Sequence, residues 1–404
     1  MTLPLEGLQV LDFSRLLPGP FCSMMLGDMG ADILRVEEPA QGSGRRAQQR
    51  QGAPERSFSH QEQVRRAAYD AAGRNKKSII LNLKEPLARE VVYRLAPRTD
   101  VVLEEFRPGV GRRLGVDYET LTRINPRIVY CSISLYGQNG PYRDLPGHDP
   151  CARAISGLLD AARYPNGTPI YINVPIIDMT AAFHAVIGIL LALQARDRTG
   201  KGQWVDISMT DAALDFMYLS SRVYFRDGNM VDRYGWAGVA AGVWATRDGK
   251  FICTTNVEPH HWANFCRAVG REDLIPQQLA KGEKAQQIVQ ELRELFQTRT
   301  REEWFRLARE VDTQIAPVLE LEEVWDDPQI RAREMVLEMA HPLLGTVRQL
   351  GVSIKLSDTP GKVRSFAPLV GQHTQEVMLA LGYTPEEIAR LEEAGAIGRF
   401  KDEG

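Results

Sequence analysis

The sequence predicts an α/β protein, because strand-like apolar segments alternate with short helical segments through the first third of the chain and a long apolar helix follows. Residues 8–13 have the composition of a buried strand, residues 18–26 that of a helix, and residues 32–36 that of the next strand. A strand, a helix and a strand in this order form a parallel unit with a right-handed crossover. The pattern recurs with a strand at 78–81, a helix at 86–95 and strands at 100–104 and 128–133. This repetition indicates a Rossmann-like, doubly wound parallel sheet.

Longer helices dominate the middle of the chain. Residues 178–194 carry apolar side chains nearly all round, which is typical of a buried central helix. A strand at 204–209 and a helix at 211–226 follow, and residues 227–330 resemble a second unit. That unit begins with a hairpin whose turn contains Asp248 and Gly249, and continues with helices at about 259–269, 285–297 and 301–310. Residues 41–74, rich in Gly, Gln, Arg and Ser, are expected to form an exposed loop.

Composition excludes several classes of protein. The 404 residues carry 49 Lys and Arg against 52 Asp and Glu, a net charge of −3, whereas nucleic-acid binding usually requires a basic excess. The five cysteines include no CxxC pair, so a structural zinc site is not expected. The N-terminus lacks a basic segment followed by an apolar one, and the longest apolar run, 181–195, is shorter than the roughly 20 residues that span a bilayer. We therefore expect a cytoplasmic protein.

The first strand–helix turn argues against a dinucleotide cofactor. A nucleotide-binding turn usually reads G-x-G-x-x-G, but residues 14–20 contain Gly19 alone. Basic residues lie at two other strand boundaries. Residues 74–78 (Arg-Asn-Lys-Lys-Ser) would form either a phosphate site or a solvated turn, whereas Arg107 and Arg113 follow a strand at the carboxyl edge, where such sheets bind ligands. The two basic clusters favour a polyphosphate ligand. The single glycine in the first turn argues that this ligand is neither NAD nor FAD.

Three further residues each allow a structural and a chemical interpretation. Asp178 opens the long apolar helix, where a carboxylate can cap the helix or act as a nucleophile. His148 lies in a turn and is either a surface hydrogen-bonding group or a proton-transfer group. Glu258 stands just before Pro259 and a helix, where it would ordinarily be a first-turn charge.

An ordered set of short motifs extends these observations over the chain. They are LDF at 11–13, PGP at 18–20, LGDMGAD at 26–32, RNKKS at 74–78, RPG at 107–109, YGQNGP at 136–141, GHD at 147–149 and TGKGQ at 199–203. In this order they resemble the class III CoA-transferase superfamily, which includes the α-methylacyl-CoA racemases. The resemblance runs from Leu5 to about Ala396.

The resemblance implies a large Rossmann-like, CoA-binding domain built from both chain ends, residues 1–226 and 331–404, and a smaller α+β domain of residues 227–330. It also implies an interlocked homodimer, with a heteromer containing a related chain as an alternative. The implied substrates are an acyl-CoA and a carboxylic acid. No metal and no NAD are expected, and no nucleic-acid or membrane partner.

Asp178 matches the catalytic aspartate of family transferases, and the resemblance implies that its carboxylate attacks the thioester to form an anhydride. The residues implied to border the CoA cleft are Arg15, Leu17, Leu81, Asn82, Leu83, Lys84, Glu105, Phe106, Arg107, Arg113, Gly147 and Asp149. Leu17 and Glu38 replace the Gln and Arg of formyl-CoA-type members, which argues against formyl-CoA and oxalate as substrates.

Two alternatives remain open at this point. His148 and Asp178 match the two-base pair of the racemases, which would move a proton at the substrate α-carbon. Glu258 matches a residue that supports this pair in the racemases. The sequence around Asp178, Pro-Ile-Ile-Asp-Met, resembles the transferases more closely than the glycine-rich racemase segment. A catalytically silent CoA-binding subunit is the third hypothesis, and the presence of Asp178 argues against it.

Overall fold

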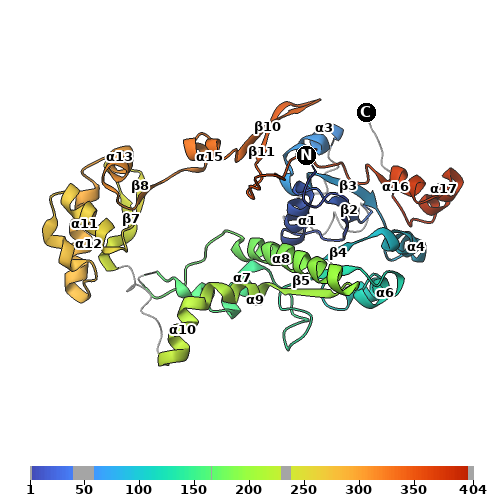
Figure 1. Cartoon of the computed structure of the whole chain (residues 1–404), viewed down its shortest axis with the longest axis horizontal. Helices are drawn as coiled ribbons and strands as arrows, with labels where there is room; N and C mark the ends of the chain where they lie inside the picture. The colour runs from blue at the N-terminus through green and yellow to red at the C-terminus, as the bar shows by residue number, and fades with distance from the viewer. Residues whose placement is uncertain (1, 40–58, 165, 229–237, 399–404) are drawn as a thin grey trace. The chain divides into compact units, whose positions relative to one another are not determined.

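The computed structural model describes residues 2–39, 59–164, 166–228 and 238–398. Contacts divide the chain into two compact units, Met1–Tyr218 with Glu334–Gly404, and Leu219–Arg333. The first unit is therefore assembled from both ends of the chain, which are coloured blue to green and red in Figure 1.

The first unit is built on a six-stranded sheet in the order β3-β2-β1-β4-β5-β6, with every neighbouring pair parallel. This confirms the predicted parallel sheet, and the order is that of a doubly wound fold. The strands are β1 (Gln9–Asp12), β2 (Asp32–Glu37), β3 (Lys76–Ile80), β4 (Val101–Glu104), β5 (Val129–Ser134) and β6 (Trp204–Ser208).

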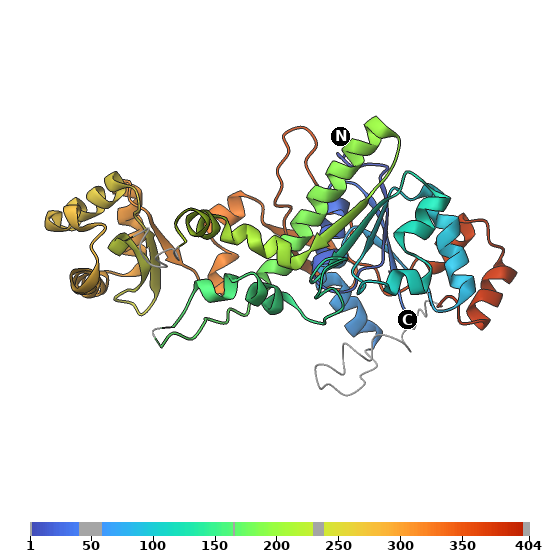
Figure 2. The ribbon, with the colours of Figure 1, turned by 90° about the horizontal axis from the view of Figure 1, so that it is seen from below.

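Helices cover both faces of this sheet (Figures 1 and 2). Alternate side chains of a strand point to opposite faces, and β1 divides accordingly, with Val10 in the core under α1 and α8 and Leu11 in the core under α4. The first face carries α1 (Pro18–Asp28), α7 (Asp149–Ile155), α8 (Ile176–Thr199) and α9 (Met209–Leu214). The second carries α4 (Pro86–Leu95), α6 (Tyr118–Ile124), α16 (Thr374–Ala380) and α17 (Pro385–Glu393).

Helix α8 is longer than expected. Its 24 residues are long and apolar enough to cross a membrane by length and composition, so the length argument from residues 181–195 is wrong. Such a helix is weak evidence of a membrane protein, because buried core helices meet the same criteria. The helix packs on α1, β5, β6 and α9, and 44% of its most apolar window is buried in the structure.

Residues 59–74 contain a helix, α3 (His60–Tyr69), where the sequence predicted a loop. The polar composition concealed it, because only Val64 and Ala68 are buried in its ten residues. The helix packs on β11 (Gly345–Leu350), which pairs with β10 (Val336–His341) in an antiparallel hairpin. A side chain of β11 completes the contact, since Gln349 donates to the carbonyl oxygen of Ala68 at 2.8 Å.

The second unit contains the sheet β7 (Ala241–Ala245), β8 (Phe251–Thr255) and β9 (Ile315–Val318). The predicted hairpin is present, and Gly249 adopts a φ of 73° at its turn. Helices α11 (Pro259–Ala268), α12 (Gly282–Phe296) and α13 (Arg301–Val311) lie near the predicted positions. Their aromatic core contains Trp262, Phe265, Phe296 and Trp304. Helices α14 (Leu321–Val324) and α15 (Pro328–Ala332) also belong to this unit, as does α10 (Tyr218–Asp227) after its first residue, whereas α5 (Val110–Leu114) belongs to the first unit.

Candidate active site

Asp178 lies in the first turn of α8, as predicted, but it does not cap the helix. The residue is half-buried, and its carboxylate forms no hydrogen bond or ion pair with any residue that the structure describes. The helix is capped instead by Asp149, whose Oδ2 accepts the N–H groups of Ile177 at 2.5 Å and Asp178 at 3.2 Å. Because a second carboxylate performs the capping, the side chain of Asp178 is free for chemistry.

The charges around Asp178 tune its acidity. Burial and, to a smaller extent, the negative charge of Asp149 raise the pKa of Asp178 to about 6, while Arg153 acts in the opposite direction. Arg153 is buried and its Nε lies 2.5 Å from Oδ1 of Asp149. A carboxylate with such a pKa is still mainly ionised at neutral pH and is more basic, and hence more nucleophilic, than an ordinary aspartate.

The structure shows no hydrogen bond or ion pair between His148 and Asp178, and the third predicted catalytic residue, Glu258, belongs to the other unit. His148 is the exposed N-cap residue of α7, next to Asp149 and after the exposed Gly147. Glu258 is the exposed N-cap residue of α11 in the second unit, and its Oε2 accepts from Nε2 of Gln314 at 2.9 Å. The roles of both residues remain predictions.

Loops after β1 and β4 meet at the centre of the sheet, where the strand order reverses. This is the position at which open α/β sheets bind their ligands. Glu105 follows β4, and its carboxylate accepts the N–H groups of Arg15, Leu16 and Gly19 from the β1–α1 loop. Burial raises the pKa of Glu105 to about 7, although these three N–H groups act to lower it. Glu105 is thus engaged with the protein itself, and its predicted contact with CoA remains a prediction.

Exposed cations follow two strands of the sheet. Arg107 and Arg113 are exposed, follow β4, and form no ion pair with the residues that the structure describes. Lys84 is exposed too, whereas its neighbours Leu81 and Leu83 are core residues and Asn82 donates its backbone N–H to the carbonyl oxygen of Ala396 at 2.8 Å.

Two of the predicted cleft residues, Arg15 and Phe106, contact each other. The guanidinium of Arg15 lies 5.8 Å from the ring centre of Phe106 and pairs with Glu38. Leu17, on the same loop as Arg15, is 38% exposed. These side chains therefore offer one cationic and two apolar contacts at the centre of the carboxyl edge.

Most of the basic run at 74–78 is buried, so the predicted solvated turn is wrong, and each of its three cations has a carboxylate partner, which argues against a phosphate site; only Lys77, paired with Glu376, is exposed. Arg74 is buried and pairs with Asp28, with Nη2 to Oδ2 at 2.5 Å. Lys76 is buried beside Asp12, at 3.5 Å, and donates to Oγ of Ser23 at 2.6 Å. A buried charge requires a partner, and sequence reasoning missed these pairs because the partners lie more than 40 positions away.

A cavity of about 520 Å³ lies at the opposite, amino edge of the sheet; residues 75–77 of the basic run line it, but none of the residues predicted to be catalytic or to border the CoA cleft does. It is lined by side chains that include Val10, Ile33, Lys77, Arg98, Arg364 and His373. The reversal of strand order places ligands at the carboxyl edge, so this cavity does not locate the active site.

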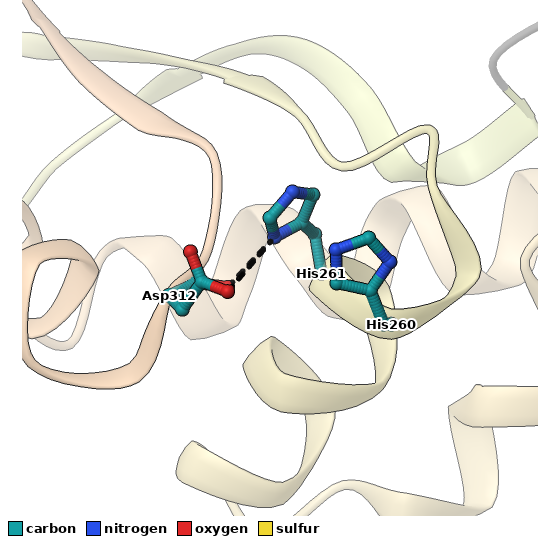
Figure 3. A group of neighbouring side chains, drawn as sticks. All are labelled: His260, His261 and Asp312. Carbon is teal, nitrogen blue, oxygen red and sulfur yellow. Dashed lines mark hydrogen bonds and ion pairs between the residues drawn. The ribbon is translucent and has the colours of Figure 1, made fainter.

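One group among the described residues could hold a metal ion: His260, His261 and Asp312 of the second unit (Figure 3). Each contributes an atom within 4.8 Å of the others. Nδ1 of His261, however, lies 2.8 Å from the backbone carbonyl oxygen of Asp312, at the end of α13. That geometry is explained by a hydrogen bond between the ring and the carbonyl group.

A family model for CoA-transferase family III matches residues 5–374. The chain belongs to CoA-transferase family III. This membership confirms the resemblance drawn from the motifs. Enzymes of this family use CoA thioesters as substrates.

Relatives of this family III chain include named transferases. An acyl-CoA transferase of Fusarium pseudograminearum is 32% identical over 97% of this chain and 88% of its own. The β subunit of a succinyl-CoA–L-malate CoA-transferase from Chloroflexus aurantiacus is 32% identical, covering 96% and 97%. A formyl-CoA:oxalate CoA-transferase of Escherichia coli O157:H7 is 30% identical, covering 98% and 100%. These names do not favour the racemase alternative.

Solved structures agree with this assignment. A CaiB/BaiF family protein from Brucella suis has a TM-score of 0.77 at 27% identity and covers 94% of this chain and 100% of its own. A Mycobacterium tuberculosis protein has a TM-score of 0.75 at 26% identity, covering 92% and 98%. Both likenesses extend over nearly the whole family III chain.

Proposed function

We propose that the protein transfers CoA from an acyl-CoA donor to a carboxylic acid, with Asp178 as the covalent acyl carrier. The observation that supports this proposal is the free, half-buried carboxylate of Asp178, beside a second carboxylate that caps the helix in its place. A carboxylate suits this chemistry because its acyl derivatives, an anhydride and a thioester, are readily displaced by a thiolate or another carboxylate.

The first half of the reaction removes CoA from the donor. A carboxylate oxygen of Asp178 attacks the thioester carbonyl carbon, the C–S bond breaks, and CoA leaves as the thiolate. The product is a mixed anhydride between the donor acyl group and Asp178. The thiolate then attacks the Asp178 carbonyl carbon of this anhydride, which releases the donor carboxylate and leaves an aspartyl–CoA thioester.

The second half repeats these steps in reverse with the acceptor acid. Its carboxylate attacks the aspartyl thioester, CoA leaves again as the thiolate, and an acceptor–aspartyl anhydride forms. Attack of the thiolate on the acceptor carbonyl carbon yields the new acyl-CoA and restores the Asp178 carboxylate. No proton is consumed overall, so the cycle needs an ionised Asp178 and no external acid or base.

The remaining parts of the proposal concern binding and assembly. Arg107, Arg113 and Lys84 supply unpaired positive charge for the phosphates of CoA. We propose an interlocked homodimer in the cytoplasm, with a heteromer as the alternative. Exposed apolar side chains on α8, among them Ile187 and Leu191 at 53% and 65%, support an interface there.

The test compares Asp178→Asn with Asp197→Asn, a change at an exposed residue of the same helix. A 2-methylacyl-CoA and succinate are supplied in deuterated water, and borohydride is used to trap the aspartyl thioester. Transfer predicts CoA on succinate, trapping at Asp178, and a loss of at least about 10³-fold in Asp178→Asn alone. Deuterium at the α-carbon without an acceptor, abolished by His148→Ala, would contradict it and establish racemisation.

A further inference from the structure

The β1–α1 loop presents backbone N–H groups where a Rossmann-like sheet would bind a phosphate, but another anion occupies them. The N–H groups of Arg15 and Leu16 each lie 2.9 Å from Oε2 of Glu105, and that of Gly19 lies 2.6 Å from Oε1. In a nucleotide-binding fold such groups hold a pyrophosphate at the start of the first helix. Here the carboxylate of Glu105 takes that position.

The first turn of α1 has few other N–H groups to offer. Pro18 and Pro20 lack an N–H, and the N–H of Phe21 donates to the carbonyl oxygen of Leu17 at 3.1 Å. The helix also has no side-chain cap and no acidic residue in its first turn. Glu105, 86 positions away, therefore provides the negative charge that a helix N-terminus favours.

The loop is shaped around this carboxylate. A Cβ atom at Gly19 would lie 2.3 Å from Cβ of Ser14 and 2.8 Å from Cδ of Glu105, so only glycine fits there. On the other side of the loop, Asp12 accepts the N–H of Ser14 at 2.8 Å and has Lys76 as a cationic partner. Glu105 has no cationic partner among the described residues, so its negative charge is met by the loop N–H groups.

We propose that Glu105 is a positioning residue of the CoA site: its carboxylate holds the β1–α1 loop, so that a CoA thioester binds against the side chains of Arg15 and Leu17 and not on the loop backbone. This inference rests on the proposed function. It assigns the phosphates of CoA to side-chain cations, since the amide site used by other Rossmann-like folds is closed. It also explains why the β1–α1 turn contains Gly19 alone and not the G-x-G-x-x-G pattern: the turn binds a carboxylate of the protein and not a pyrophosphate.

The test follows the loop and the ligand separately in the full-length protein. Hydrogen–deuterium exchange of the peptide covering residues 14–21 reports on the loop, and calorimetric titration with coenzyme A reports on binding. Glu105→Gln is compared with Asp117→Asn, which alters the carboxylate cap of α6 in the same unit. Since a charged acceptor of N–H groups is lost, Glu105→Gln should speed exchange at the loop and weaken coenzyme A binding, each by about tenfold or more.

Asp117→Asn should leave both measurements unchanged, and Glu105→Asp should restore part of each. Wild-type affinity for coenzyme A should rise between pH 6 and pH 8 by more than that of Glu105→Gln, whose side chain does not titrate. A merely structural role would not produce that difference between the two pH profiles.

Unchanged loop exchange in Glu105→Gln would overturn the inference, as would faster exchange with unchanged affinity for coenzyme A. A wild-type protein that binds no coenzyme A would instead contradict the proposed function, while the exchange measurement would still decide whether Glu105 holds the loop. If Glu105→Gln fails to fold, Glu105→Asp and the wild-type exchange rates at Arg15, Leu16 and Gly19 provide the same decision.

Discussion

At the scale of single residues, the structure distinguishes two carboxylates, Asp149 and Asp178, either of which could cap the start of α8 as judged from the sequence. Asp149 binds the N–H groups at the start of α8 and pairs with Arg153, whereas Asp178 remains unpaired among the described residues. Sequence reasoning identified Asp178 but weighed it as a possible cap, because a carboxylate at a helix start fits both roles. Arg153 was missed, since a lone arginine in a short helix carries no signal of its partner.

The acidity of Asp178 predicts the pH dependence of the reaction. Its pKa of about 6 means that the nucleophilic form is lost as the pH falls through 6. We expect kcat/KM for transfer to rise about tenfold per pH unit below 6 and to level off above 7. Asp149→Asn removes a negative charge that raises the pKa of Asp178, so the midpoint should move to lower pH. A pH profile that is flat between 5 and 7 would contradict this prediction.

At the scale of secondary structure, apolar periodicity predicted most elements, and α4 was predicted at its observed limits of residues 86 and 95. Helix α3 was missed because its burial comes from a hairpin almost 300 positions later, which no local pattern records. The buried pairs of Arg74 and Lys76 were missed for the same reason. Local sequence thus predicted the sheet, while the contacts that bury charges depend on segments distant along the chain.

The cap of α8 can be tested by its contribution to stability. Asp149→Ala removes the helix cap and leaves Arg153 buried without its partner, so we expect the free energy of unfolding to fall by about 3 kcal/mol. Asp117→Ala is the matched control, because it removes the carboxylate cap of α6 without uncovering a buried cation, and should cost about 1 kcal/mol. Urea denaturation measures both. Equal losses in the two variants would show that the buried ion pair contributes nothing.

At the scale of the whole molecule, the exposed apolar face of α8 bears on the proposed assembly. Phe183, Ile187, Leu190 and Leu191 are all at least 40% exposed on a helix whose other side lies in the core. Light scattering should give the mass of two chains for the wild-type protein. Ile187→Glu with Leu191→Glu should reduce the dimer fraction or the yield of soluble protein, because charges would replace the apolar contacts. Gln194→Glu, an exposed polar change on the same helix, should not.

The edge strand β3 receives its last hydrogen-bond partners from the far end of the chain. Ser78 donates its backbone N–H to Nδ1 of His373 at 3.2 Å, and Ile80 donates to Oγ1 of Thr374 at 3.1 Å. These pairs are separated by 295 and 294 positions, so a ribosome working at about 5–20 residues per second needs roughly 15–60 s to supply them. During this interval of translation the edge of β3 lacks these partners and can pair with strands of other chains. Messages truncated before codon 373 should yield chains that chaperones retain.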